Sequence, residues 1–248
     1  MFPILVNIGP VTIYTYGFFI AAAFLAGMVW AAREADAKGL DPKIVFDVGF
    51  YIVLSAILGS RLLYVLLNPS YFLQFPLEIF KFWKGGLVFL GGALLATAAV
   101  LLYFKRRNLS VWLWADCFAP GLALGQAIGR LGCFSAGCCY GKECELPWAA
   151  TFSNPASLAP QHIPLHPTQL YHALAGLVSF GILLAAKRHL KQPGQLMGLF
   201  FVLYAFFRFT IEFFRDDYRG TVGFFSVTQV IAAAVLIIGV IIIYQRRA

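Results

Sequence analysis

Residues 129–144, GRLGCFSAGCCYGKEC, place one arginine among four of the chain's five cysteines. Three kinds of chemistry fit this composition. The thiols could form a metal or redox cluster, they could form a structural disulfide, or they could be incidental to an arginine that binds phosphate. Arginine suits phosphate because its planar guanidinium offers two parallel charge-assisted hydrogen bonds.

The spacing of the cysteines separates these alternatives only in part. Cys133, Cys138, Cys139 and Cys144 read C-x4-C-C-x4-C, which matches none of the usual C-x2-C metal or iron–sulfur spacings. A thiol exchanger related to membrane disulfide oxidases would need a C-x-x-C pair, which the adjacent Cys138 and Cys139 do not form. We therefore expect no metal, and keep open a disulfide of Cys138 or Cys139 with Cys144.

The elements that carry this segment belong in a membrane. The 248 residues are 60% hydrophobic and only 12% charged, with a mean hydropathy of +0.79, so the apolar surface exceeds what one soluble core can bury. A helix crosses ~30 Å of hydrocarbon with roughly 20 apolar residues. Seven runs qualify and predict an all-α membrane protein, one polytopic domain over 1–248, with spans at about 11–32, 44–67, 86–104, 112–133, 168–186, 195–214 and 222–244.

The basic residues predict the orientation of these spans. With the N-terminus outside, the inner connections and C-terminus hold eleven Lys and Arg, and the outer connections hold five. Basic residues are retained on the cytoplasmic side, so the N-terminus is expected outside and the C-terminus inside. The same residues explain most of the +8 net charge, and no nucleic-acid partner is expected. Two long outer connections, 68–86 and 140–167, are expected to form a small cap, the first as an interfacial helix.

Ionisable side chains inside a span are costly and usually mark a function or a buried partner. Arg61, Arg130 and Arg208 lie toward the outer ends of their predicted spans, which suggests an anion held between helices. Asp47 and Asp116 lie near inner ends, where a helix-start or interfacial role is expected.

Side chains near these arginines share helical faces with them. Glu212 follows Arg208 by four residues, and Arg215 comes one turn later. Glu212 could orient Arg208 for chemistry, or the pair could only join two helices. Gln126 shares a face with Arg130, and the helix that carries them is kept slim by Gly121, Gly125, Gly129 and Gly132.

In a membrane, the abundant phosphate is that of a phospholipid, so the charge layout favours binding of a lipid headgroup near the outer leaflet. His166, ahead of Pro167 in HPTQLYH, could anchor the entry of the fifth span or accept a proton, and the residues leave both open. Tyr16 lies at the outer interface, where aromatic residues are common.

Several segments together resemble the bacterial prolipoprotein diacylglyceryl transferases in order and spacing. They are TIYTYG (12–17), GGLVFLGG (85–92), GQAIGRLGCFSAGCCYG (125–141), and HPTQLYHA with RFTIEFFR (166–173 and 208–215). The resemblance implies a seven-span enzyme of the bacterial inner membrane with its active site toward the periplasm. The implied reaction moves the diacylglyceryl group of phosphatidylglycerol to the lipobox cysteine of a preprolipoprotein signal peptide, releasing glycerol 1-phosphate, without a cofactor.

The resemblance also implies roles for residues. Arg130 and Arg208 match motif arginines that would hold the leaving phosphate, and Glu212 would orient Arg208. His166 completes the expected catalytic set. The residues expected to bind substrate are Tyr16, Arg61, Gln126, Gly129, Cys133, Cys138, Gly141, Gln169 and Arg215.

The chain departs from the family pattern at four positions. Cys133 stands where the family has Asn, Cys138 where it has Glu, and Lys142 where it has Arg. Leu90 stands at the histidine proposed as the family's base and can carry no proton. His166 is then the best remaining candidate for the base, with a loop cysteine second. Otherwise the chain is a divergent paralogue that binds phospholipid and uses another acceptor or none.

Overall fold

A computed structural model of the chain describes residues 2–9, 11–216 and 220–246. The chain forms two compact units, a larger one of residues 1–34 and 115–248 and a smaller one of residues 35–114. Each unit has its own packing. The expected single domain over 1–248 stays a prediction.

The described chain is predominantly helical, as predicted. Six of its helices are long and apolar enough to cross a membrane, namely α1, α2, α4, α6, α7 and α8. A seventh long helix, α5, carries Asp116, Pro120 and Arg130 and does not meet the same measure. The helix bounds are α1 Thr15–Ala37, α2 Lys43–Leu67, α3 Pro69–Gln74, α4 Phe89–Arg106, α5 Val111–Ala136, α6 Thr168–Ala186, α7 Gln195–Glu212 and α8 Val227–Gln245.

The start of the first predicted span was wrong. Residues 11–14 form strand β2 (Val11–Tyr14), which pairs antiparallel with β1 (Ile4–Ile8), and helix α1 begins only at Thr15. The segment is rich in β-branched residues, which favour strands, and Gly9 takes a φ of +58° between the two strands. Apolar composition alone does not distinguish such a hairpin from the first turns of a helix.

The connection 68–86 differs from the expected interfacial helix. It contains the six-residue α3 and two 3-10 helices, η1 Pro76–Phe80 and η2 Phe82–Lys84. Pro69 and Pro76 each open one of these elements, where proline costs little because the first N–H groups of a helix have no partner within it. The prolines therefore divide the connection into short pieces.

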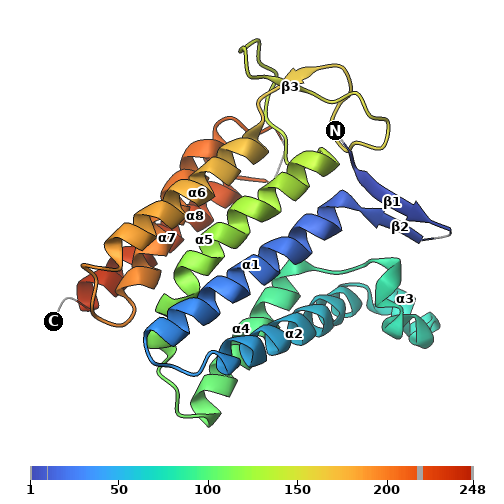
Figure 1. The fold of residues 1–248 in the computed structure, drawn as a ribbon. Helices are drawn as coiled ribbons and strands as arrows, with labels where there is room; N and C mark the ends of the chain where they lie inside the picture. Colours follow the sequence, from blue (N-terminus) through green and yellow to red (C-terminus); the bar gives the residue numbers. More distant parts are fainter. Residues whose placement is uncertain (1, 10, 217–219, 247–248) are drawn as a thin grey trace. The chain divides into compact units, whose positions relative to one another are not determined.

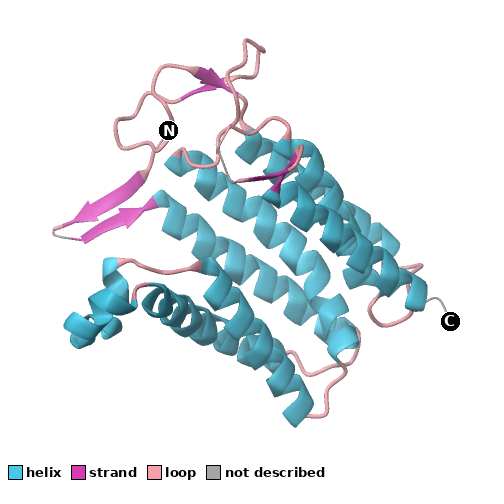
Figure 2. Cartoon of the chain, turned by 180° about the vertical axis from the view of Figure 1, so that it is seen from behind, coloured by secondary structure: helices cyan, strands magenta, loops and turns pink. Residues whose placement is uncertain are grey.

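The three strand pairs of the described chain belong to the larger unit, one ahead of α1 and two in connections between its helices. Besides β1–β2 they are β3 (Ala150–Thr151) with β4 (Pro164–Leu165), and β5 (Thr221–Val222) with β6 (Phe225–Ser226). Figure 2 shows the strands at one end of the unit's helices. At that end α5 and α7 finish and α1, α6 and α8 begin, so connections distant in sequence are gathered there.

Glycines bring α1 and α5 of the larger unit into close contact. A Cβ on Gly121 would collide with the carbonyl of Gly27, and a Cβ on Gly132 would lie 2.9 Å from the Cβ of Phe19. Backbones approach this closely only where side chains are absent. The prediction that glycines keep α5 slim is confirmed at these positions.

The remaining helices of the larger unit lie on the side of α5 away from α1 (Figure 1). A Cβ on Gly176 of α6 would lie 3.0 Å from Ala127 of α5. Between α7 and α8, Gly198 and Gly239 face each other, and a Cβ on Gly239 would lie 2.8 Å from the Gly198 carbonyl oxygen. These approaches set α6, α7 and α8 at fixed positions on their neighbours.

Asp116 of α5 caps the start of α7. Its carboxylate accepts a hydrogen bond of 2.8 Å from the backbone N–H of Gly194 and another of 2.8 Å from that of Met197. Such N–H groups at a helix start have no partner within the helix. The expected structural role of Asp116 is confirmed, and it fixes the helix that carries Arg208 and Glu212.

The smaller unit is built on α2 packed against α4. Gly59 and Gly91 face each other so closely that a Cβ on either would collide with the other's carbonyl. The Tyr103 hydroxyl donates a 2.8 Å hydrogen bond to Asp47. Asp47 therefore has a structural role between the two helices.

Replacing Asp116 with alanine should lower the free energy of unfolding by roughly 1–3 kcal/mol, because two buried N–H groups lose their acceptor. Thermal unfolding of the detergent-solubilised protein measures the change. The exposed Asp36→Ala is the matched control and should unfold like the wild type. Equal stability of the two variants would contradict the capping role.

Candidate active site

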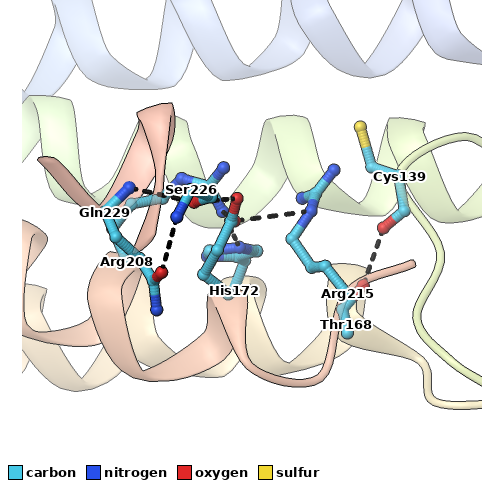
Figure 3. Close-up of polar contacts among 8 residues, drawn as sticks. Cys139, Thr168, His172, Arg208, Arg215, Ser226 and Gln229 are labelled. Atoms are coloured by element: carbon cyan, nitrogen blue, oxygen red, sulfur yellow. Dashed lines mark hydrogen bonds and ion pairs between the residues drawn. The ribbon is translucent and has the colours of Figure 1, made fainter. Parts of the chain in front are cut away.

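An ion-paired cluster lies at the strand-bearing end of the larger unit. Arg208 Nη1 lies 2.8 Å from Glu212 Oε2, and the two residues are four positions apart on one face of α7, as predicted. Arg215, just beyond the end of α7, places its Nε 3.7 Å from the same oxygen. Figure 3 shows Arg208 and Arg215 in this cluster, with His172 between them.

The cluster is buried and held from a second helix. The side chains of Arg208, Glu212 and Arg215 are 5%, 7% and 2% exposed, so solvent screens their charges little. Ser226 Oγ donates a 3.0 Å hydrogen bond to Glu212 Oε1. Ser226 is also the N-cap of α8, where it forms a capping box with Gln229. The start of α8 thus fixes the carboxylate at the end of α7.

His172 of α6 completes the surroundings of Arg208. Its Nε2 lies 3.2 Å from Arg208 Nη1. A guanidinium has no acceptor atom, so the histidine nitrogen accepts this bond and the ring proton resides on Nδ1. His172 is 1% exposed and is positioned to orient the arginine.

Arg130 of α5 brings a third positive charge to the cluster. Its charge acts on both Arg208 and His172. The Arg130 side chain is half-buried, and no described residue forms a hydrogen bond or ion pair with its guanidinium. In the part of the chain that the structure describes, three arginines lie near the Glu212 carboxylate, so positive charge predominates at this site. Such a site suits a phosphate group.

Gly141 lies where two connections cross the end of the site. Its N–H donates a 3.0 Å hydrogen bond to the His166 carbonyl, and it forms a β-bridge with Arg215. A Cβ at Gly141 would collide with the Phe214 carbonyl and lie 2.6 Å from the His166 Cβ. Glycine is therefore required where the two connections cross. The crossing in turn positions the backbone of Arg215.

The histidine expected to be catalytic, His166, has a different neighbourhood from the arginines. Its Nδ1 lies 3.0 Å from the Tyr171 hydroxyl, which also accepts a 2.9 Å bond from Trp148 Nε1. If Nδ1 carries the proton, Nε2 is free to accept one. If Tyr171 donates instead, Nε2 carries the proton. The proposed role of His166 as base requires the first arrangement.

The thiol-bearing loop is held by the start of α6. Thr168 Oγ1 donates a 2.7 Å bond to the Cys139 carbonyl, and Gln169 Nε2 a 2.8 Å bond to the Cys138 carbonyl. Both side chains are fully buried. Gln169 Oε1 is also buried and finds no hydrogen-bond donor within the described part of the chain. An unpaired buried acceptor is costly, which suits a donor from a bound molecule.

The disulfide with Cys144 that the sequence left open is not formed in the structure, where none of the five cysteines is disulfide-bonded. The sulfur atoms that come together are those of Cys133, Cys138 and Cys139, within 4.8 Å of one another. Hydrogen bonds with the Cys133 and Cys138 thiols lower the pKa of Cys139, and a further one from Arg215 adds to this, although burial acts to raise it. The pKa of Cys138 is raised by hydrogen bonds with the thiols of Cys133 and Cys139 and by burial.

Three other predicted residues lie along α1 and α5. Tyr16 lies in the first turn of α1, is 43% exposed and lies close enough to Arg130 to interact with its charge. Gln126 is half-buried one turn before Arg130. A Cβ on Gly129 would meet Ile20 at 3.6 Å, an ordinary contact, so the packing of α1 on α5 does not require glycine there.

Arg61 belongs to the smaller unit, where it binds backbone carbonyls. Its Nε donates to Ile79 over 2.9 Å and its Nη1 to Gly85 over 2.8 Å. The guanidinium lies over the rings of Tyr64 and Phe72 beside a pocket of about 250 Å³. The third guanidinium of the larger unit's cluster is Arg215, and a role for Arg61 in binding substrate stays a prediction.

Sequence reasoning missed His172 and Ser226. A signal for His172 was present in the sequence, because His172 lies four residues after Thr168 and shares a face of α6 with it. The sequence S-V-T-Q from Ser226 to Gln229 carries the capping-box signature. Neither signal reveals that the two side chains meet Arg208 and Glu212 from other helices.

Comparison with known proteins identifies the chain's relatives. Residues 3–245 match the family model described as prolipoprotein diacylglyceryl transferase. A protein of Clostridium tetani named phosphatidylglycerol–prolipoprotein diacylglyceryl transferase is 34% identical over 242 residues, 98% of this chain and 96% of its own length. Proteins of the same name from Vibrio atlanticus and Bordetella avium are both 36% identical, over 98% and 86% of this chain and 91% and 81% of their own lengths.

Replacing Glu212 with glutamine should lower the free energy of unfolding by about 3 kcal/mol, because breaking a buried ion pair leaves uncompensated charge. Thermal unfolding in detergent measures the loss, with the exposed Glu145→Gln as the matched control. If both variants unfold at the same temperature, Glu212 does not hold the arginines together.

Proposed function

We propose, because the chain belongs to the prolipoprotein diacylglyceryl transferase family, that it transfers the diacylglyceryl group of phosphatidylglycerol to a prolipoprotein cysteine. The product is a thioether, and glycerol 1-phosphate is released. The observation that carries the proposal is the excess positive charge around Arg130, whose guanidinium has no partner among the described residues.

The reaction places negative charge where these arginines lie. The thiolate sulfur of the acceptor attacks a glyceryl carbon, a carbon–sulfur bond forms, and the carbon–oxygen bond to phosphate breaks. The bonding electron pair goes to the phosphate oxygen, which takes the leaving group from one negative charge to two. Preorganised cations lower the barrier most where charge develops, and the acceptor thiol must first lose its proton.

The residues divide this work between contact and positioning. Arg130 and Arg208 bind the phosphate and stabilise the leaving group, with Arg215 adding a third positive charge. Glu212 and His172 are positioning residues, because they orient Arg208 through the contacts at 2.8 and 3.2 Å. Tyr16, Gln126, Gly129, Gly141 and Gln169 line the approach of substrate.

The site would face the periplasm in a protein of the bacterial inner membrane. In this arrangement α5 is the seventh span, because its 26 residues exceed the roughly 20 that the hydrocarbon requires. The cluster lies where α1 begins, and the excess of basic residues in the connections at the other end of the spans supports an outside position for the start of the first span. The signal peptide of the acceptor would then approach from the outer leaflet.

Replacing Arg130 with alanine should lower the yield of lipidated peptide at least about 100-fold, as expected when a preorganised charge at the transition state is lost. The assay uses purified protein, labelled phosphatidylglycerol and a lipobox peptide. Arg188→Ala removes an exposed arginine and is the matched control, which should keep wild-type activity. Arg130→Lys keeps the positive charge but loses the planar guanidinium with its two parallel hydrogen bonds. Its activity should therefore lie between that of Arg130→Ala and that of the wild type.

The competing function is a phospholipid-binding protein without this reaction, and Leu90 is the observation that favours it. Leu90 is 59% exposed near the start of α4 and can transfer no proton. Lipid binding by the wild type without any lipidated peptide would support this alternative. Growth of a strain depleted of its own transferase, restored by this chain, would overturn it.

A further inference from the structure

We propose that Cys133, Cys138 and Cys139 bind one thiophilic metal ion, such as Zn²⁺, through three thiolates. Their sulfur atoms lie within 4.8 Å of one another. A zinc–sulfur bond is ~2.3 Å long, so two thiolates on one tetrahedral ion stand about 3.8 Å apart. Small side-chain rotations would bring the three sulfurs to this separation.

The end of α5 explains why an unusual spacing forms such a group. Gly137, at a φ of +75°, follows the helix, and its N–H bonds the Phe134 carbonyl while the Cys138 N–H bonds the Cys133 carbonyl. These two bonds define a Schellman motif, which brings the side chains at its first and last positions together. Cys133 and Cys138 occupy those positions. The helix end therefore does what a C-x2-C turn does elsewhere.

The third ligand and the loop are positioned in advance. Cys139 takes a φ of +62° directly after Cys138, and the two carbonyls are held by buried Thr168 and Gln169 at 2.7 and 2.8 Å. Metal sites depend on such supporting bonds to fix their ligands. Cys144 of the same loop is not in the group.

Cations next to the three cysteines complement the charge of a metal–thiolate site. Three thiolates and one divalent ion carry a net charge of −1, which adjacent cations stabilise. Arg215 hydrogen-bonds the Cys139 sulfur, and the charge of Arg130 acts on Cys133. The excess positive charge of the arginine cluster is thus partly balanced by the metal-bound thiolates.

Three protein ligands leave one tetrahedral position open, as in catalytic rather than structural zinc sites. On the proposed function, which this step depends on, the acceptor cysteine binds there and loses its proton to water. Its sulfur then lies beside the arginine-bound phosphodiester. When the carbon–sulfur bond forms, the electron pair of the broken carbon–oxygen bond leaves on phosphate and the thioether dissociates from the ion.

The test of the metal site is titration of the reduced, full-length protein with Co²⁺, followed by its thiolate charge-transfer absorption and by competition with Zn²⁺. We expect one equivalent to bind. Cys133→Ser, Cys138→Ser and Cys139→Ser should each weaken binding more than about 100-fold, beyond the cost of losing a supporting residue. Cys144→Ser is the matched control and should bind like the wild type.

Two further measurements keep the result decisive if a variant fails to fold. X-ray absorption of the Zn²⁺-loaded wild type needs no variant and should show three sulfur ligands at ~2.3 Å. No bound metal, fewer sulfurs, or equal affinity in all four variants would overturn the proposal. A disulfide among the three cysteines would also overturn the proposal, if it forms in protein purified without reductant and still forms when metal is added. The group would then be a redox pair.

The fourth position is tested without any transfer reaction. A lipobox peptide added to the Co²⁺-loaded protein should shift the absorption, and the same peptide with serine for cysteine should not. A shift without transferase activity would refute the proposed function and leave the metal site standing. Transferase activity that persists in metal-free protein would refute the role of the ion and leave the proposed function standing.

Discussion

The arrangement of the larger unit depends on one buried carboxylate. Glu212 pairs with Arg208 at 2.8 Å, lies 3.7 Å from Arg215 and accepts a hydrogen bond from Ser226. It thereby ties the end of α7 to the turn that follows and to the start of α8. A carboxylate this deeply buried is tolerated only when it is paired. Glu212 and the two guanidinium groups therefore stabilise one another. One negative charge among three arginines still leaves the cluster cationic.

The helices could be predicted because a membrane span is a property of composition and length. The run 168–186 coincides with α6, and most other limits differ by a few residues. The error at residues 11–14 has a physical cause, since β-branched residues satisfy a hydropathy window whether they form a hairpin or a helix. The broken connection at 68–86 shows a second cause, because prolines divide a segment whose apolar pattern is continuous.

Parts of the site could be predicted where the geometry is local. The pairing of Arg208 with Glu212 follows from helical spacing alone. The contacts of His172 and Ser226 could not be predicted, because each joins helices whose packing the residues do not specify. The close approach of Cys133 to Cys138 could not be predicted for a related reason. Spacing rules for metal ligands assume a particular turn, whereas here a helix end with glycine in the left-handed conformation brings Cys133 to Cys138.

Helix α7 is secured at both of its ends. Asp116 binds the backbone N–H groups at its start, and Glu212 with Ser226 secures its finish. A helix bound in this way cannot slide or turn about its axis without breaking buried polar contacts at one end or the other. A bulky ligand that enters this unit therefore meets α7 as a fixed wall, because any shift of the helix would break a buried contact at one of its ends.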